Sequence, residues 1–161
     1  MAYYRRLGEV TGKRHTQLRD PEGRLYREEL MGEEGFSSDS SLLYHRGVPS
    51  ALVATDVWEL PDQARTPNHP LAPRHLRLHE LETGPDAVTG RRLVLGNNDV
   101  RISYVVTGVD ASPLYRNAIG DECVFVEAGS GVVETVFGAV SYRAGDYVVV
   151  PRATTHRWLP A

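Results

Sequence analysis

The second half of the chain alternates apolar and polar positions in the way that β-strands do. Apolar side chains at every second position over 100–106 predict a half-buried strand. A β-branched run over 132–137 predicts a second strand, and Val140-Ser-Tyr142 predicts another short one. A continuous apolar run over 147–150, closed by a proline, predicts a buried strand, and a last strand is expected over 156–159.

Glycine-rich turns separate these predicted strands. Val124 and Val126 lead into Ala128-Gly-Ser-Gly131, which is typical of a hairpin connection, and Ala144-Gly145-Asp146 forms a turn. Short strands at intervals of about eight to twelve residues predict an all-β sandwich or barrel. No fixed-period repeat indicates a solenoid.

The first half of the chain is polar and irregular. Asp20-Pro-Glu-Gly23 predicts a turn, 35–41 predicts a serine-rich loop, and 25–31 predicts a short helix. Four prolines within 61–73 mark that stretch as a connector. We therefore expect an N-terminal arm with edge strands and a proline-rich connector over 1–73, followed by a barrel over 74–161.

Composition narrows the class of protein. The 161 residues are 41% hydrophobic and 24% charged, which is typical of a globular chain. The net charge of -3 and the absence of a basic stripe argue against nucleic acid as a partner. No apolar stretch reaches the length of a membrane span, so we expect a cytoplasmic protein. The single cysteine, Cys123, is expected to be a small buried apolar residue.

The most specific local pattern runs from Gly145 to His156. It resembles the second motif of the cupin superfamily, which is Gly, five residues, Pro, one residue, Gly, two residues, His, with Ala153 here at the second glycine position. Upstream, Glu122 and a glycine-rich stretch resemble the first motif. The His-x-His pair of that motif should fall within 115–118, where this chain has no histidine.

The chemistry of this pattern allows two interpretations. A non-haem iron or zinc site needs three protein ligands, whereas Glu122 and His156 supply two and Asn117 is a poor third. One interpretation is a degenerate metal site. The other, which the missing histidines favour, is a barrel whose interior polar residues hydrogen-bond to one another.

A second group of candidate ligands follows the connector. Residues 75 and 79 would share one face of a strand, but two imidazoles do not make a selective metal site, so packing is the favoured interpretation. The candidate ligands of this second group are His69, His75, His79, Glu80 and Glu82.

The serine-rich loop over 35–41 has neither a phosphate-binding glycine pattern nor a nucleophile elbow.

Three longer segments, 25–45, 116–122 and 137–158, resemble bacterial homogentisate 1,2-dioxygenases, and the resemblance covers nearly the whole chain. It implies a two-barrel (bicupin) protein that uses Fe(II) to cleave the ring of homogentisate in tyrosine breakdown. It also implies that two His and one Glu of the second barrel hold the iron, outside this chain. Glu122 and His156 are then vestigial ligand positions, and no residue receives a catalytic role.

Three hypotheses remain open. The first is the N-terminal cupin barrel of a homogentisate dioxygenase-like protein, inactive alone, whose partners are a second barrel or other subunits and an aromatic substrate. The second is a stand-alone metal-dependent cupin enzyme that uses Glu122, His156 and either His45 or His79. The third is a non-catalytic binding or oligomerisation module, since exposed β edges and a long arm suit a homo-oligomer.

Overall fold

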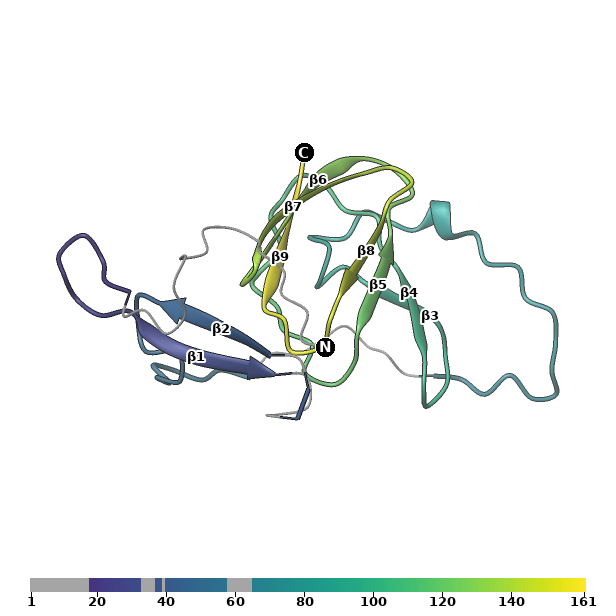
Figure 1. The fold of residues 1–161 in the computed structure, drawn as a ribbon. Coiled ribbons are helices and arrows are strands. Elements are labelled where there is room, and N and C mark those ends of the chain that lie inside the picture. The colour runs from purple at the N-terminus through teal and green to yellow at the C-terminus, as the bar shows by residue number, and fades with distance from the viewer. Residues whose placement is uncertain (1–17, 33–36, 39, 58–64) are drawn as a thin grey trace. The chain divides into compact units, whose positions relative to one another are not determined.

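In the computed structural model, which describes residues 18–32, 37–38, 40–57 and 65–161, the chain forms two compact units (Figure 1). One comprises Met1–Val57 with Val136–Gly138, and the other Trp58–Thr135 with Ala139–Ala161. Within the described residues, regular structure is all β apart from one 3-10 turn, η1 (Leu78–Glu80). The all-β prediction is therefore confirmed. These residues include no helix long and apolar enough to cross a membrane.

The first unit contains one antiparallel hairpin, β1 (Arg27–Gly32) and β2 (Ser40–His45). The helix predicted over 25–31 is wrong, because residues 27–32 form β1 and pair with β2, while Leu25 forms an isolated β-bridge with Arg19. Local preference for a helix gives way to non-local strand pairing here. The predicted turn at Asp20–Gly23 is confirmed: the Gly23 N–H donates to the Asp20 carbonyl at 2.9 Å. Of the serine-rich loop predicted over 35–41, residues 35, 36 and 39 lie outside the described residues, and Ser40 and Ser41 open β2.

The second unit carries the strands that the sequence predicts and one further strand, β3, that it does not. They are β3 (Arg92–Gly96), β4 (Arg101–Tyr104), β5 (Glu122–Phe125), β6 (Ser130–Thr135), β7 (Gly138–Arg143), β8 (Tyr147–Val150) and β9 (His156–Pro160).

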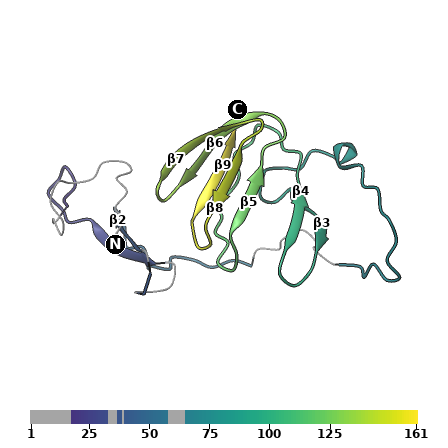
Figure 2. The ribbon, with the colours of Figure 1, turned by 45° about the vertical axis from the view of Figure 1, so that its right-hand side comes forward.

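Three small sheets make up this unit: a β3–β4 hairpin, a β5–β8 pair and a β7–β6–β9 sheet (Figure 2). An isolated bridge between Tyr115 and His156 extends the third. The hairpin predicted at Ala128–Gly131 is wrong, because β5 pairs with β8 whereas β6 pairs with β7 and β9. A glycine turn is present, with Gly129 at φ +84°, but it carries the chain from one sheet to another. This arrangement is consistent with the cupin-type barrel that the motif predicts.

The core of the second unit is small and centred on β6 and β9. Val133 and Trp158 face each other across these two strands and are buried with Val88. Partly buried apolar side chains pack around them, including Tyr142, whose ring centroid lies 5.3 Å from that of Trp158. The same two strands also position the polar cluster described below.

The pair β5–β8 is less buried than its sequence predicts. Val148 and Val150 point inward, but Tyr147 and Val149 are 71% and 64% exposed, so the prediction of a fully buried strand over 147–150 is wrong. Cys123, opposite Val149 in the register, is exposed and not buried as expected. Apolar residues therefore occupy both faces of this pair.

Candidate functional site

The two cupin-like positions, Glu122 and His156, come together inside the second unit. Glu122 opens β5 and His156 opens β9. Their side chains are 10% and 0% exposed, and 3.9 Å separates the His156 Nε2 from the Glu122 Oε2. The two positions singled out by the sequence pattern are therefore neighbours in the structure, although 34 positions separate them in the sequence.

The imidazole of His156 is held by Tyr115 and Thr154. The backbones of His156 and Tyr115 exchange hydrogen bonds of 2.9 and 2.8 Å, and their rings meet edge to face at 5.6 Å. The Nδ1 lies 3.0 Å from the Thr154 carbonyl, which can only accept, so Nδ1 carries a proton. In the neutral ring, Nε2 is then the lone-pair nitrogen. It has no hydrogen-bond partner among the described residues and is turned toward Glu122.

Both oxygens of the Glu122 carboxylate are engaged. The Arg91 Nη1 donates to Oε2 at 3.0 Å, and the Asn117 Nδ2 donates to Oε1 at 3.1 Å. Arg91 is fixed in turn by its Nε, which donates to the Ala87 carbonyl at 2.8 Å, and by its guanidinium, which lies 5.5 Å from the centre of the Tyr115 ring. The cluster of Arg91, Tyr115, Asn117, Glu122 and His156 is called the interior cluster below.

The charge distribution of the interior cluster affects Tyr115. Burial raises the pKa of its hydroxyl above the ordinary value, and the Glu122 charge raises it further, while Arg91 partly offsets both effects. The phenol therefore stays protonated at neutral pH and is not a general base.

The interior cluster does not fit Fe(II). A non-haem iron site needs three protein ligands, commonly two His and one carboxylate, with open positions beside them. Here one imidazole and one carboxylate are present, and a cation already occupies the carboxylate. No group of three His, Cys, Asp or Glu able to hold a metal occurs in the described ranges. The arrangement instead ties β5, β9 and the segment before β3 together through one charged network.

Sequence reasoning missed Arg91 and Tyr115. Tyr115 lies within 115–118, where the cupin-like pattern predicts a histidine pair, but its contacts with His156 and Arg91 were not predicted. Arg91 lies 31 residues before Glu122 in the sequence and is followed by a second arginine, Arg92. No local pattern distinguishes it from a surface arginine. Only the folded structure shows that it reaches the interior.

The buried Asp86 stabilises the turn that precedes Arg91 and positions its side chain. Its carboxylate accepts the backbone N–H groups of Val88 and Thr89 at 2.6 and 2.9 Å, together with the Thr89 hydroxyl. Burial raises the pKa of Asp86, but the hydrogen bonds from Thr89 and Val88 and the charge of Arg91 outweigh it, so the pKa lies below its ordinary value.

This lowered pKa predicts an acid-sensitive contribution to stability. A carboxyl with a depressed folded-state pKa stabilises fully above its unfolded value of about 3.9, and this contribution fades as pH falls through the folded value. Asp86→Asn should therefore lower the free energy of unfolding by about 1–2 kcal/mol at neutral pH. Urea titrations should show that difference shrinking near about pH 3. The exposed Asp110→Asn should match wild type at both pH values; an equal deficit of Asp86→Asn at both would contradict the assignment.

Ala153 adopts a backbone conformation that suits glycine. Its φ is +63°, in the left-handed region, at the position where the cupin-like pattern has its second glycine. The Ala153 N–H donates to the Asn117 carbonyl at 2.6 Å, which ties this turn to the interior cluster.

Replacing Ala153 by glycine should relieve this backbone strain and stabilise the folded protein. Ala153→Gly should raise the free energy of unfolding by about 0.5–1 kcal/mol, since the left-handed penalty of alanine exceeds the entropic cost of glycine. Thermal and urea unfolding measure the change. Ala144→Gly is the matched control, because the φ of Ala144 is not positive; it should destabilise slightly. A loss of stability in both variants would contradict the strain.

The second group of predicted ligands lies apart from any strand. The strand expected around 75–79 is wrong: residues 71–77 have no regular structure, and His79 belongs to η1. The His79 Nε2 lies 3.4 Å from the Glu127 carboxylate, to which the Tyr104 hydroxyl donates at 2.7 Å. Glu80 pairs with Arg77. These contacts agree with the packing interpretation of the sequence.

Comparison with known proteins finds a relative that is named as a dioxygenase. Over 157 residues the chain is 33% identical to a protein of Saccharolobus solfataricus whose name is "putative dioxygenase". The matched stretch is 97% of this chain but 41% of that protein, so this chain spans about two fifths of the relative's length. No family model matches the chain, and no solved structure matches it.

Proposed function

We propose that this chain is the iron-free, structural cupin barrel of a homogentisate 1,2-dioxygenase-like protein. The similarity to a protein named as a dioxygenase, over nearly all of this chain, supports the dioxygenase class. The resemblance of segments 25–45, 116–122 and 137–158 supports homogentisate as the substrate. The observation that carries the proposal is the interior cluster, in which Arg91 binds the carboxylate that a metal would need.

In this proposal the chemistry belongs to a second barrel. That barrel supplies two His and one Glu for Fe(II) and binds the hydroxyl and carboxylate of the aromatic substrate. Within the present chain, Arg91 and Asn117 hold Glu122, while Tyr115 and Thr154 hold His156, so that the barrel offers a rigid surface to its partner. Its role is to position the partner and not to act on substrate.

Oxygen consumption tests the proposal. The 161-residue protein, supplied anaerobically with Fe(II) and then with homogentisate and air, should consume oxygen no faster than the Fe(II)-only control. Sustained uptake that depends on the protein would overturn it. Glu122→Gln serves as the matched variant: uptake that disappears with this substitution would place the activity in the interior cluster.

The stand-alone metal enzyme receives less support. It needs a third ligand beside Glu122 and His156, for which the sequence offered His45 or His79. The His45 Nε2 lies 2.8 Å from the Glu29 carboxylate within the β1–β2 hairpin, and His79 contacts Tyr104 and Glu127. Neither histidine completes a ligand group in the described part of the chain.

A further inference from the structure

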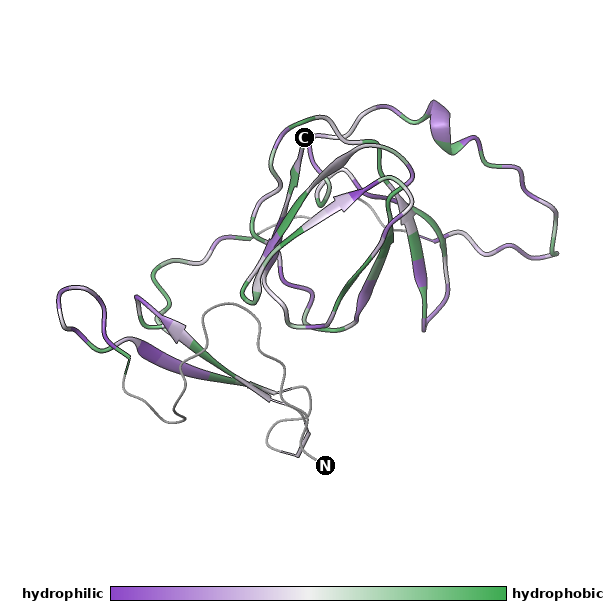
Figure 3. Cartoon of the chain, turned by 45° about the horizontal axis from the view of Figure 1, so that its top comes forward, coloured by the Kyte–Doolittle hydropathy of each residue, from purple (hydrophilic) through white to green (hydrophobic). Residues whose placement is uncertain are grey.

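The interior of the second unit contains buried polar atoms that lack a hydrogen-bond partner among the described residues. They are Thr154 Oγ1, His156 Nε2 and Trp158 Nε1. These residues occupy alternate positions along and just before β9, and each is buried, so their side chains point to the same interior side. Figure 3 shows that the strands of this unit carry hydrophilic as well as hydrophobic stretches. Because buried polar atoms in folded proteins almost always bind a protein group or an ordered water, these atoms indicate a small polar ligand.

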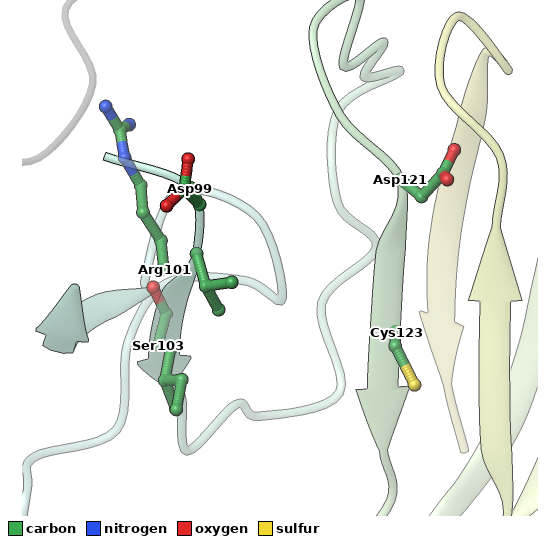
Figure 4. Close-up of a pocket in the computed structure, with 7 residues that line it drawn as sticks. Asp99, Arg101, Ser103, Asp121 and Cys123 are labelled. Carbon is green, nitrogen blue, oxygen red and sulfur yellow. The ribbon is translucent and has the colours of Figure 1, made fainter. Parts of the chain in front are cut away.

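The side chain of Glu122 completes this interior region and points away from the surface of β5. Asp121 and Cys123 line a cavity of about 380 Å³ between β4 and β5 (Figure 4). Both are exposed, whereas the side chain of Glu122, between them in the sequence, is 10% exposed, since successive side chains of a strand point to opposite faces. Glu122 therefore faces His156 and not this cavity. With the His156 side chain 0% exposed, a ligand beside the two must be small.

Two hydrogen-bond acceptors face each other at this place. A carboxylate offers about four acceptor positions. Three donors use the carboxylate of Glu122: the Arg91 Nη1 at Oε2, the Asn117 Nδ2 at Oε1, and the Tyr115 hydroxyl. One acceptor position is left, and Oε2 lies 3.9 Å from the His156 Nε2. Because Nδ1 of the ring donates to a carbonyl, Nε2 of the neutral ring is an acceptor as well. A ligand between the two must therefore donate two hydrogen bonds.

The charge of the interior cluster requires that this ligand be neutral. Arg91 already lies 3.0 Å from the Glu122 Oε2, so a cation between Glu122 and His156 would add a second buried positive charge opposite one carboxylate. A protonated His156 would do the same. Water is neutral, small and a double donor. At about 2.8 Å from each atom, its oxygen would lie about 2 Å to one side of the line joining them, with its two hydrogen bonds about 90° apart, near the angle between the hydrogens of water.

We propose that a buried water molecule bridges the His156 Nε2 and the Glu122 Oε2 and donates one hydrogen to each. This water lies between the two residues that the cupin-like pattern singles out. It links β9 to β5, because the 3.9 Å between the two side chains is too long for a direct hydrogen bond. His156 then stays neutral, and Arg91 remains the counter-ion of Glu122. This water site does not depend on the dioxygenase role.

NMR spectroscopy of the isotope-labelled full chain tests the water directly. At neutral pH, long-range proton–nitrogen correlations of the His156 ring should show a proton on Nδ1 and none on Nε2. Water-selective NOE and ROE spectra should show cross-peaks of opposite sign, as expected for a long-lived water, to the ring protons that flank Nε2. Thr154→Val should keep these cross-peaks; their loss would assign them to the Thr154 hydroxyl and overturn the proposal. Protons on both ring nitrogens, or an assigned ring without a water cross-peak, would overturn it as well.

Removal of the acceptor provides a second measurement. His156→Phe keeps an aromatic ring at this position and removes Nε2. Magnetic relaxation dispersion of water, which counts long-lived bound waters, should find one fewer in this variant than in wild type. His75→Phe, at an exposed position outside the strands, is the matched control and should keep the wild-type count. Equal counts in wild type and folded His156→Phe would overturn the proposal; if that variant does not fold, the wild-type NMR spectra decide.

Discussion

Arg91→Met is expected to lower the free energy of unfolding by about 3 kcal/mol. The substitution keeps much of the side-chain volume but leaves the Glu122 carboxylate, 10% exposed, without its cation. Asn117 alone cannot replace a charged donor 3.0 Å from the carboxylate. Urea unfolding monitored by tryptophan fluorescence measures the loss.

A double-mutant cycle is the control for this prediction. Glu122→Gln alone should also destabilise, whereas Arg91→Met with Glu122→Gln should recover most of the loss, because removal of both charges leaves no buried ion unpaired. Additive losses would show that the two side chains act independently. That result would remove the ion pair as the organising contact of the interior cluster.

Trp158→Ala is expected to cost about 3–5 kcal/mol, a large share of the total stability of a domain. The indole is 3% exposed and packs on Val133, Val88 and Tyr142 in a core with few fully buried side chains. The cavity left behind cannot be filled by neighbours in strands β6 and β9. Thermal unfolding should show a large fall in the midpoint or the loss of a cooperative transition.

Two further aromatic substitutions distinguish the effect of losing a buried ring from the effect of losing any large ring. Tyr147→Ala removes a ring that is 71% exposed and should change stability by less than about 1 kcal/mol. Trp158→Phe keeps most of the buried volume and removes an Nε1 that has no hydrogen-bond partner among the described residues, so its cost should be small. Equal losses for Trp158→Ala and Tyr147→Ala would contradict the core as described.

The strands of the second unit could be predicted because their signal is local. Alternation over 100–106 and the β-branched runs after 130 place β4, β6, β7, β8 and β9 close to their observed bounds. Which strands pair could not be predicted, because pairing depends on packing between distant segments. The glycine turn at 128–131 is real, yet it joins two sheets instead of forming a hairpin.

The candidate site could be predicted only in part. Glu122 and His156 follow from the spacing of the cupin-like pattern, and they do lie together. Arg91 could not be predicted, because its position depends on a turn anchored by Asp86 and on no motif of its own. The exposure of Cys123 was also unpredictable, since a strand with two apolar faces is indistinguishable from a buried strand in sequence.

Iron content measures the central claim most directly. After anaerobic loading with Fe(II) and gel filtration, wild type and Glu122→Gln should carry the same small, substoichiometric amount of iron, because the cation position beside Glu122 is filled by Arg91. Circular dichroism confirms that both proteins are folded. Stoichiometric iron in wild type that is lost in Glu122→Gln would contradict the account and identify the interior cluster as a metal centre.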